Sequence, residues 1–126
     1  MNLTRLYAIG FGVVYTLVGI LGFFVAPTLD VHNLIIFPVN VLHNVVHLLV
    51  GLAGIAFFMS NRTVEYARGM AILFAVLVVA GLIVPNGFGL VPLGGADIAL
   101  HAATAILAAV AGWLYVGRKE GERVAY

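Results

Sequence analysis

The amino-acid sequence predicts an all-α integral membrane protein, a bundle of four transmembrane helices in a chain of 126 residues. Composition is the first reason, because 63% of the residues are hydrophobic and only 9% are charged, outside the range of soluble globular domains. The second reason is that the hydrophobic residues gather in four long stretches. The third reason is that every Lys and Arg lies near one end of a stretch, and in four successive crossings these ends would all lie on the same side of the bilayer.

Each of the four stretches is long enough to cross a membrane as a helix. A helix rises about 1.5 Å per residue, so about 20 residues cover a hydrocarbon core of about 30 Å. Helices pair every backbone N–H and C=O within the segment, as lipid requires, and the stretches lack the polar alternation of barrel strands. The expected helices are Leu6–Ala26, Val41–Phe58, Tyr66–Val84 and Ala96–Val116.

The links between the stretches predict two tandem helical hairpins within one transmembrane domain. Proline stands where the first and third helices run out, at Pro27 and Pro85, and Asn40 is placed to cap the second helix. The polar link Ser60–Glu65 is short, which makes the second and third helices antiparallel neighbours. Within the single domain 1–126, we expect hairpin 1 at about 4–60, hairpin 2 at about 64–117 and a charged, frayed tail at 118–126.

Orientation follows from the positions of the basic residues. The links on the opposite side, 27–39 and 85–95, contain no Lys or Arg. By the positive-inside rule, the basic side faces the cytoplasm, which predicts that both termini are cytoplasmic. The cations on the basic side are Arg5, Arg62, Arg68, Arg118, Lys119 and Arg123.

Aromatic residues gather near the same basic ends. Such positions are typical of the belt of Trp and Tyr at the membrane–water interface, so we expect these side chains to be anchors first. They are Tyr7, Phe57, Phe58, Tyr66, Trp113 and Tyr115.

The two halves of the chain resemble each other. Pro38 and His47 match Pro92 and His101 at one constant offset, and each pair brackets the start of a helix that begins on the outer side. Two hairpins of the same topology imply a parallel repeat, related by an axis along the membrane normal.

One group of polar residues stands out in the apolar helices. His43 and His47 are spaced i, i+4 on the second helix, and Asp97 and His101 have the same spacing on the fourth, so each pair lies on one helix face. If the chain is duplicated, His43 corresponds to Asp97 and His47 to His101. All four residues would then lie at matching depth, within the outer two turns of their helices. An ionisable residue inside a membrane indicates a functional site. His32, in the preceding link, could approach the same mouth.

Three interpretations of this group are open. In the first, His47 and His101 are axial ligands of haem b or of the magnesium of a chlorophyll. In the second, His43, His47, Asp97 and His101 surround a divalent metal ion, zinc-like or copper-like, since imidazole and carboxylate are suitable ligands. In the third, their role is structural: the histidines donate to carbonyls or to Asp97 across helices, and Asp97 caps the fourth helix as Asn40 caps the second.

Small residues predict close packing of the helices. Gly19 and Gly22 in the first helix, and Gly51 and Gly54 in the second, let neighbouring backbones approach each other. Close packing counts against a haem within one chain, because a porphyrin needs separated helices.

The opening of the second helix carries a distinctive pattern: Asn40, His43, Asn44, His47, Gly51 and Gly54. It resembles a bacterial family of small four-span membrane proteins, the domain-of-unknown-function family 4383. In that family an Asn and two His residues open helix two, and an Asp and a His open helix four, here Asp97 and His101. The resemblance implies a four-helix bundle in a bacterial cytoplasmic (inner) membrane, or an internal membrane continuous with it. It supplies no established activity and no catalytic residue.

These observations favour a non-enzymatic membrane protein, an oligomer or an accessory, structural subunit of a larger membrane complex, because so small a chain has almost no soluble surface for substrates. The alternative is a redox or pigment protein that binds haem, chlorophyll or a metal. A small transporter ranks last, since no ionisable residue is expected near the membrane midplane. A formal net charge of +1 excludes a nucleic-acid partner, and the lack of Cys excludes disulfides, thiolate sites and cysteine nucleophiles.

Overall fold

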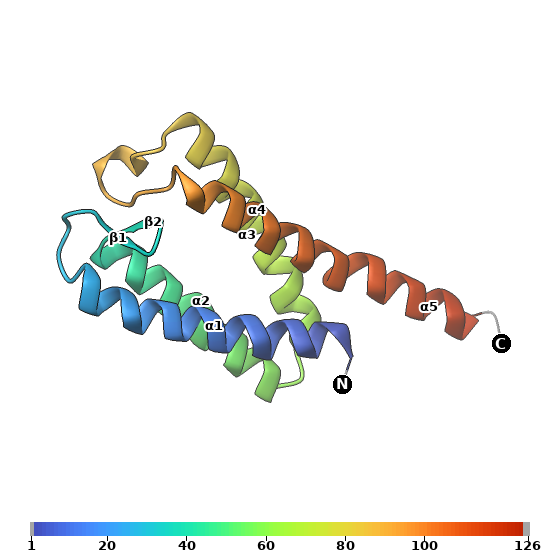
Figure 1. Ribbon diagram of the computed structural model, residues 1–126. Helices are drawn as coiled ribbons and strands as arrows, with labels where there is room; N and C mark the ends of the chain where they lie inside the picture. The colour runs from blue at the N-terminus through green and yellow to red at the C-terminus, as the bar shows by residue number, and fades with distance from the viewer. Residues whose placement is uncertain (1, 125–126) are drawn as a thin grey trace.

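The computed structural model describes residues 2–124, and in that range four helices are long and apolar enough to span a membrane. The first three are α1 (Leu3–Val25), α2 (Val41–Met59) and α3 (Thr63–Ile83), and the fourth begins at Ala96. The most closely packed pairs are α1 with α2 and α3 with α4, so the chain forms two hairpins in succession (Figure 1). The predicted all-α, membrane-spanning four-helix bundle is confirmed.

Glycines bring the backbones of α1 and α2 into direct contact. A Cβ atom added at Gly54 would lie 2.8 Å from the backbone oxygen of Ala8, and one at Gly51 would collide with the backbone nitrogen of Thr16. A Cβ at Gly19 would lie 2.9 Å from the backbone nitrogen of Leu48. The close packing expected from the small residues is therefore confirmed along this seam.

The turn between α2 and α3 ends the first hairpin with a compact C-terminal cap. Asn61 has a positive φ of 58°, and the N–H of Arg62 donates to the carbonyl of Phe57 at 2.9 Å. This is the Schellman pattern, in which Asn is one of the few residues other than Gly that adopts the left-handed conformation readily. The Arg5 guanidinium donates to the Asn61 side chain, which ties the start of α1 to this turn.

The links 27–39 and 85–95 lie at the end of the bundle opposite the N-terminus and are called the outer links for that reason. The first of them contains a short antiparallel hairpin that no sequence signal predicted. Strand β1 (His32–Leu34) pairs with β2 (Phe37–Val39), with His32 opposite Val39, and Ile35 and Ile36 form the turn between them. Two-residue hairpin turns are usually marked by Asn-Gly or Gly-containing pairs, because their backbone requires positive φ. Here Ile35 takes that conformation, with φ at 61°, so the usual signal is missing.

Asn40 joins the two outer links at the end of the bundle opposite the N-terminus. Its Oδ1 accepts a hydrogen bond from the backbone nitrogen of His43 at 3.0 Å, which confirms the predicted cap of α2. Its Nδ2 donates to the carbonyl of Leu90 at 2.7 Å. Leu90 directly follows a 3-10 turn, η1 (Gly87–Gly89), in the second link. One side chain thus connects the first hairpin to the second.

The last helix is longer than predicted and contains a π-helical turn. It comprises α4 (Ala96–Ala109), the π segment η2 (Val110–Tyr115) and α5 (Val116–Val124). A π turn displaces backbone carbonyls from their usual partners, and here the Nε of Arg68 donates to the carbonyl of Gly112 at 2.9 Å. The expected frayed tail is wrong for residues 118–124, where good helix formers continue the helix. Residues 125 and 126 lie outside the described range.

Aromatic side chains fill the space between the hairpins. Tyr7, Tyr15, Tyr66 and Phe74 are each at most 5% exposed. The hydroxyl of Tyr66 donates to the carbonyl of Val50 at 2.8 Å, so its polar end is satisfied inside the bundle. The expectation that Tyr7 and Tyr66 anchor the chain at the membrane interface is wrong, because both are core residues.

Candidate functional site

The predicted polar group forms a buried cluster between the two hairpins. His43 and His47 enter it from α2, and Asp97 and His101 enter it from α4. None of the four side chains is more than 3% exposed. His43 Nε2 lies 3.0 Å from His47 Nε2 and 3.4 Å from Asp97 Oδ2. The two i, i+4 pairs therefore meet across the bundle, near the outer ends of their helices.

The three imidazoles converge closely enough for a metal ion. One nitrogen from each of His43, His47 and His101 lies within 4.8 Å of the others. A tetrahedral site with metal–nitrogen distances of about 2.0–2.1 Å places its ligand nitrogens about 3.3 Å apart. Side-chain adjustments of an ångström or so would therefore bring the three nitrogens to ligand distance. Asp97 lies beside His43, outside this group of three.

Aromatic rings from the other two helices hold the imidazoles in place. The Tyr15 ring of α1 lies 5.2 Å from the His47 ring, and the Phe74 ring of α3 meets the His101 ring edge-on at 5.1 Å. The hydroxyls of Tyr15 and Thr104 are 2.7 Å apart and share a hydrogen bond. All four helices thus contribute to the site or its support.

The sequence analysis did not single out Tyr15. Its position could have identified it, because Tyr15 lies near the middle of α1, about as far from the membrane interface as a residue of that helix can be. A phenol there must find a hydrogen-bond partner inside the protein. Phe74 gave no such signal, because an apolar ring in an apolar helix is typical of lipid-facing and buried positions alike.

The burial of the Asp97 carboxylate is the energetically least favourable feature of the site. It is 0% exposed, and among residues 2–124 neither of its carboxylate oxygens has a hydrogen-bond partner. The N-cap of α4 is Gly95 and no side chain caps it, so the interpretation of Asp97 as a cap is wrong. The carboxylate instead points at His43. A buried carboxylate without hydrogen bonds is unfavourable unless it is neutralised by a proton or a cation.

The imidazoles are only partly hydrogen-bonded, because His43 Nε2 and His47 Nε2 bond each other. The buried Nδ1 atoms of His43, His47 and His101 also have no hydrogen-bond partner within the described part of the chain. The structural interpretation, in which the histidines donate to carbonyls across helices, therefore finds little support in the contacts present. What remains of it is the proximity of His43 to Asp97 and to the backbone of Pro92 in the second link.

Two small cavities flank the cluster under the outer links. One, of about 260 Å³, is lined by all three clustered histidines and by residues 87–93 of the second link. The other, of about 200 Å³, reaches His47 and Asp97 between Tyr15 and the first link. His32, by contrast, is exposed on β1 and does not belong to the cluster. The outer links thus form the roof of the site.

Comparison with known proteins agrees with this architecture. The chain has no match among curated proteins or among solved structures. The family model described as Domain of unknown function (DUF4383) matches residues 5–114, which include most of each of the four spans and every residue of the cluster. Because that match covers most of the chain, this multi-pass membrane protein belongs to the DUF4383 family.

Proposed function

We propose that the protein binds a divalent transition-metal ion through His43, His47 and His101. The observation that carries the proposal is the convergence of three buried imidazoles within 4.8 Å of one another. Imidazole is a preferred ligand of zinc, copper, iron and nickel, whereas magnesium and calcium prefer oxygen ligands. A site of this composition therefore favours a transition metal.

The charge balance of the site supports a cation. Asp97 is buried beside His43 with unpaired oxygens, and the cluster contains no Lys or Arg within the described residues. A bound divalent ion would neutralise the carboxylate, while Asp97 would offset the charge of the ion. We assign Asp97 the role of compensating charge, or of fourth ligand after a small rotation toward the ion.

The packing of the rings supports a metal ion in preference to haem or chlorophyll. The His43 and His101 ring centroids are 6.1 Å apart, and Tyr15 and Phe74 close the flanks of the cluster. The adjoining cavities hold only about 260 and 200 Å³. A porphyrin between His47 and His101 would have to displace these rings and separate the hairpins.

Metal analysis of the purified protein tests this proposal. We expect about one equivalent of metal per chain by elemental analysis, and a visible d–d absorption when Co²⁺ is added to chelator-treated protein. His101→Ala should weaken Co²⁺ binding by more than about 100-fold, since it removes a ligand rather than a supporting group. His32→Ala is the matched control, because His32 is the one histidine outside the cluster.

Equal Co²⁺ affinity of the His32→Ala and His101→Ala variants would contradict the proposal. A Soret or chlorophyll absorption band that disappears in His47→Ala would replace the metal ion with a pigment as the ligand. The spectrum of the protein as isolated therefore separates the two cofactor classes before any metal is added.

We further propose that the metal serves a larger membrane assembly in which this protein is an accessory subunit. Outside the four helices the described chain consists of two outer links, one short turn and the helical extension α5, which leave little surface for a soluble substrate. Chemical crosslinking in intact membranes followed by mild extraction would identify a partner. Recovery of monomer alone would contradict this role without affecting the metal site.

Both termini are proposed to be cytoplasmic, because all six cations lie at the α1 N-terminal end of the bundle or on α5. The absence of Cys makes this simple to test with single cysteines. A membrane-impermeant maleimide should label Ile35→Cys in intact cells and Ser60→Cys only after permeabilisation. The reverse pattern would show that the imidazole cluster lies near the cytoplasmic face.

A further inference from the structure

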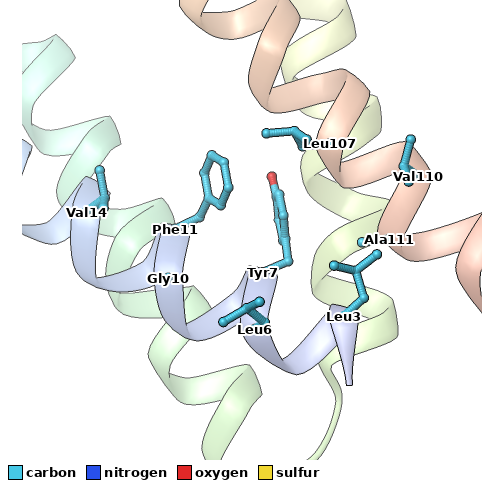
Figure 2. Close-up of a pocket in the computed structure, with 9 residues that line it drawn as sticks. All are labelled: Leu3, Leu6, Tyr7, Gly10, Phe11, Val14, Leu107, Val110 and Ala111. Carbon is cyan, nitrogen blue, oxygen red and sulfur yellow. The ribbon is translucent and has the colours of Figure 1, made fainter. Parts of the chain in front are cut away.

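A lateral groove runs between α1 and the last helix, from α4 into η2, closer to the N-terminal end of α1 than the imidazole cluster is. Its volume is about 550 Å³, and its lining is apolar. Figure 2 shows Tyr7 and Phe11 rising from α1 toward Leu107 on α4. These rings, stacked at 4.3 Å, keep the two helices apart. A Cβ atom at Gly10 would meet nothing within 4 Å, so the groove is open beside this residue.

The groove spans about one leaflet rather than a whole membrane. On α1 it extends from Leu3 to Val14, about 17 Å at about 1.5 Å per residue. Half of a hydrocarbon core is about 15 Å. Beyond Val14 the gap narrows to the cavity of about 200 Å³ that shares Phe11 and Val14 with the groove and is covered by Leu34 and Ile35 of the first outer link. A transmembrane helix of a partner would need a contact surface along the full thickness of the membrane.

A pocket with basic residues lies next along both helices from the end of the groove at Leu3 and Ala111. This pocket, of about 360 Å³, is lined by Asn2 and Thr4 of α1 and its cap, and by Tyr115, Lys119 and Arg123 along the last helix. Among the described side chains that line it, Glu120 is the one acidic residue. Asn2 and Thr4 of the pocket flank Leu3 of the groove, and Tyr115 of the pocket follows Ala111 of the groove by about one turn, so the two adjoin.

We propose that the groove and the pocket together bind one anionic glycerophospholipid. The acyl chain lies against Leu6, Gly10 and Val14, and the phosphate lies near Lys119 and Arg123. Two features select this occupant: the groove has the length of one leaflet, and the charge at its mouth complements a phosphate. The site is separate from the proposed metal centre, and neither proposal depends on the other.

Native mass spectrometry of the full chain in mild detergent, with phosphatidylglycerol or phosphatidylcholine as probes, tests the charged half of the site. We expect the double variant Lys119→Gln, Arg123→Gln to retain phosphatidylglycerol at least about tenfold less well. Arg118→Gln removes a charge from the same helix but outside the pocket lining, so it should retain the lipid. Glu120→Gln should raise the retention of phosphatidylglycerol.

A pair of glycine variants tests the apolar half. Gly10→Leu places a side chain in the groove and should lower the retention of both lipids about fivefold or more. Gly69→Leu is the matched control, because Gly69 also meets nothing within 4 Å but lies on α3, outside the groove. Indistinguishable lipid retention by these two variants would overturn the proposal. So would efficient crosslinking of Gly10→Cys between two copies, since the groove would then be a contact between chains.

Discussion

Along the seam between α1 and α2, glycines at Gly51 and Gly54 place one backbone directly against the other. Between the two hairpins, by contrast, the space is filled by tyrosine, phenylalanine and histidine side chains. The seam leaves no room for a ligand, and its strength comes from close van der Waals contact. The space between the hairpins is wider, and it contains the imidazole cluster with its two adjoining cavities and the lateral groove.

This difference indicates that the seam stabilises the fold, whereas the space between the hairpins holds the binding site. A rigid first hairpin presents His43 and His47 from one face of α2, while the second hairpin supplies His101 and Asp97. Side-chain contacts such as that of His43 with His101, together with the bond from Asn40 to Leu90, connect the outer ends of the hairpins. Substitutions in the seam should therefore reduce stability, whereas substitutions between the hairpins should change ligand binding more than stability.

The largest loss of stability is expected for Gly51→Ala. The added methyl would collide with the backbone nitrogen and the hydroxyl of Thr16, and neither α1 nor α2 can move away without breaking the rest of the seam. Overpacking of this kind costs about 1–3 kcal/mol, and we expect the upper end of that range. The measurement is the free energy of unfolding in mixed micelles by SDS titration. Gly69→Ala, at an open position on α3, is the control and should lose nothing.

Asp97→Asn should separate ligand binding from stability. Metal affinity should fall about 10- to 100-fold, as it does when a group that supports a metal site is replaced. The metal-free protein should be at least as stable as the wild type, because the variant removes a buried carboxylate that has no hydrogen bond within the described residues. Co²⁺ titration and SDS titration of the same samples measure both quantities. A large loss of stability in the metal-free variant would make Asp97 a structural residue.

Much of this architecture follows from sequence patterns. Apolar stretches of membrane-spanning length predicted the four helices, and the i, i+4 spacing of His43 with His47 and of Asp97 with His101 predicted two polar faces. The duplication predicted that the two pairs lie at the same depth in the membrane, so the sequence alone predicted that they would meet. Asn40 was identified as a cap for the simple reason that it precedes an apolar helix.

Other features depend on tertiary contacts that no local pattern encodes. The hairpin β1–β2 turns at Ile35 without the usual glycine, so its signal was absent. The π turn near Gly112 is accompanied by a hydrogen bond from Arg68 on another helix. Tyr7 was predicted at the membrane interface because its position along the helix fits that role, but the rotation of α1 places it in the core. Depth along a helix can be read from sequence more easily than the direction in which the helix faces.

Asn40→Ala tests the connection between the hairpins. It removes a helix cap worth about 1 kcal/mol and the hydrogen bond to the Leu90 carbonyl. We expect a loss of about 1–2 kcal/mol in the free energy of unfolding. Asn40→Asp keeps the oxygen that caps α2 but loses both amide donor bonds, the one to Leu29 within the first hairpin and the one to Leu90 between the hairpins. If these bonds position the roof of the site, the Asp variant should also bind Co²⁺ more weakly while its α2 remains intact.

The smallest effect is expected for Thr104→Val. The substitution preserves the shape of the side chain and removes the hydroxyl that bonds Tyr15, which supports the His47 ring. An interhelical hydrogen bond in a membrane contributes about 0.6 kcal/mol, so the loss of stability should be of that size. Thr104→Ser retains the hydroxyl and serves as the control. Because Tyr15 contacts the site through its ring, a drop in Co²⁺ affinity in the Val variant alone would show that the hydrogen bond sets the position of that ring. Equal affinities in the two variants would show that packing against Phe74 is sufficient.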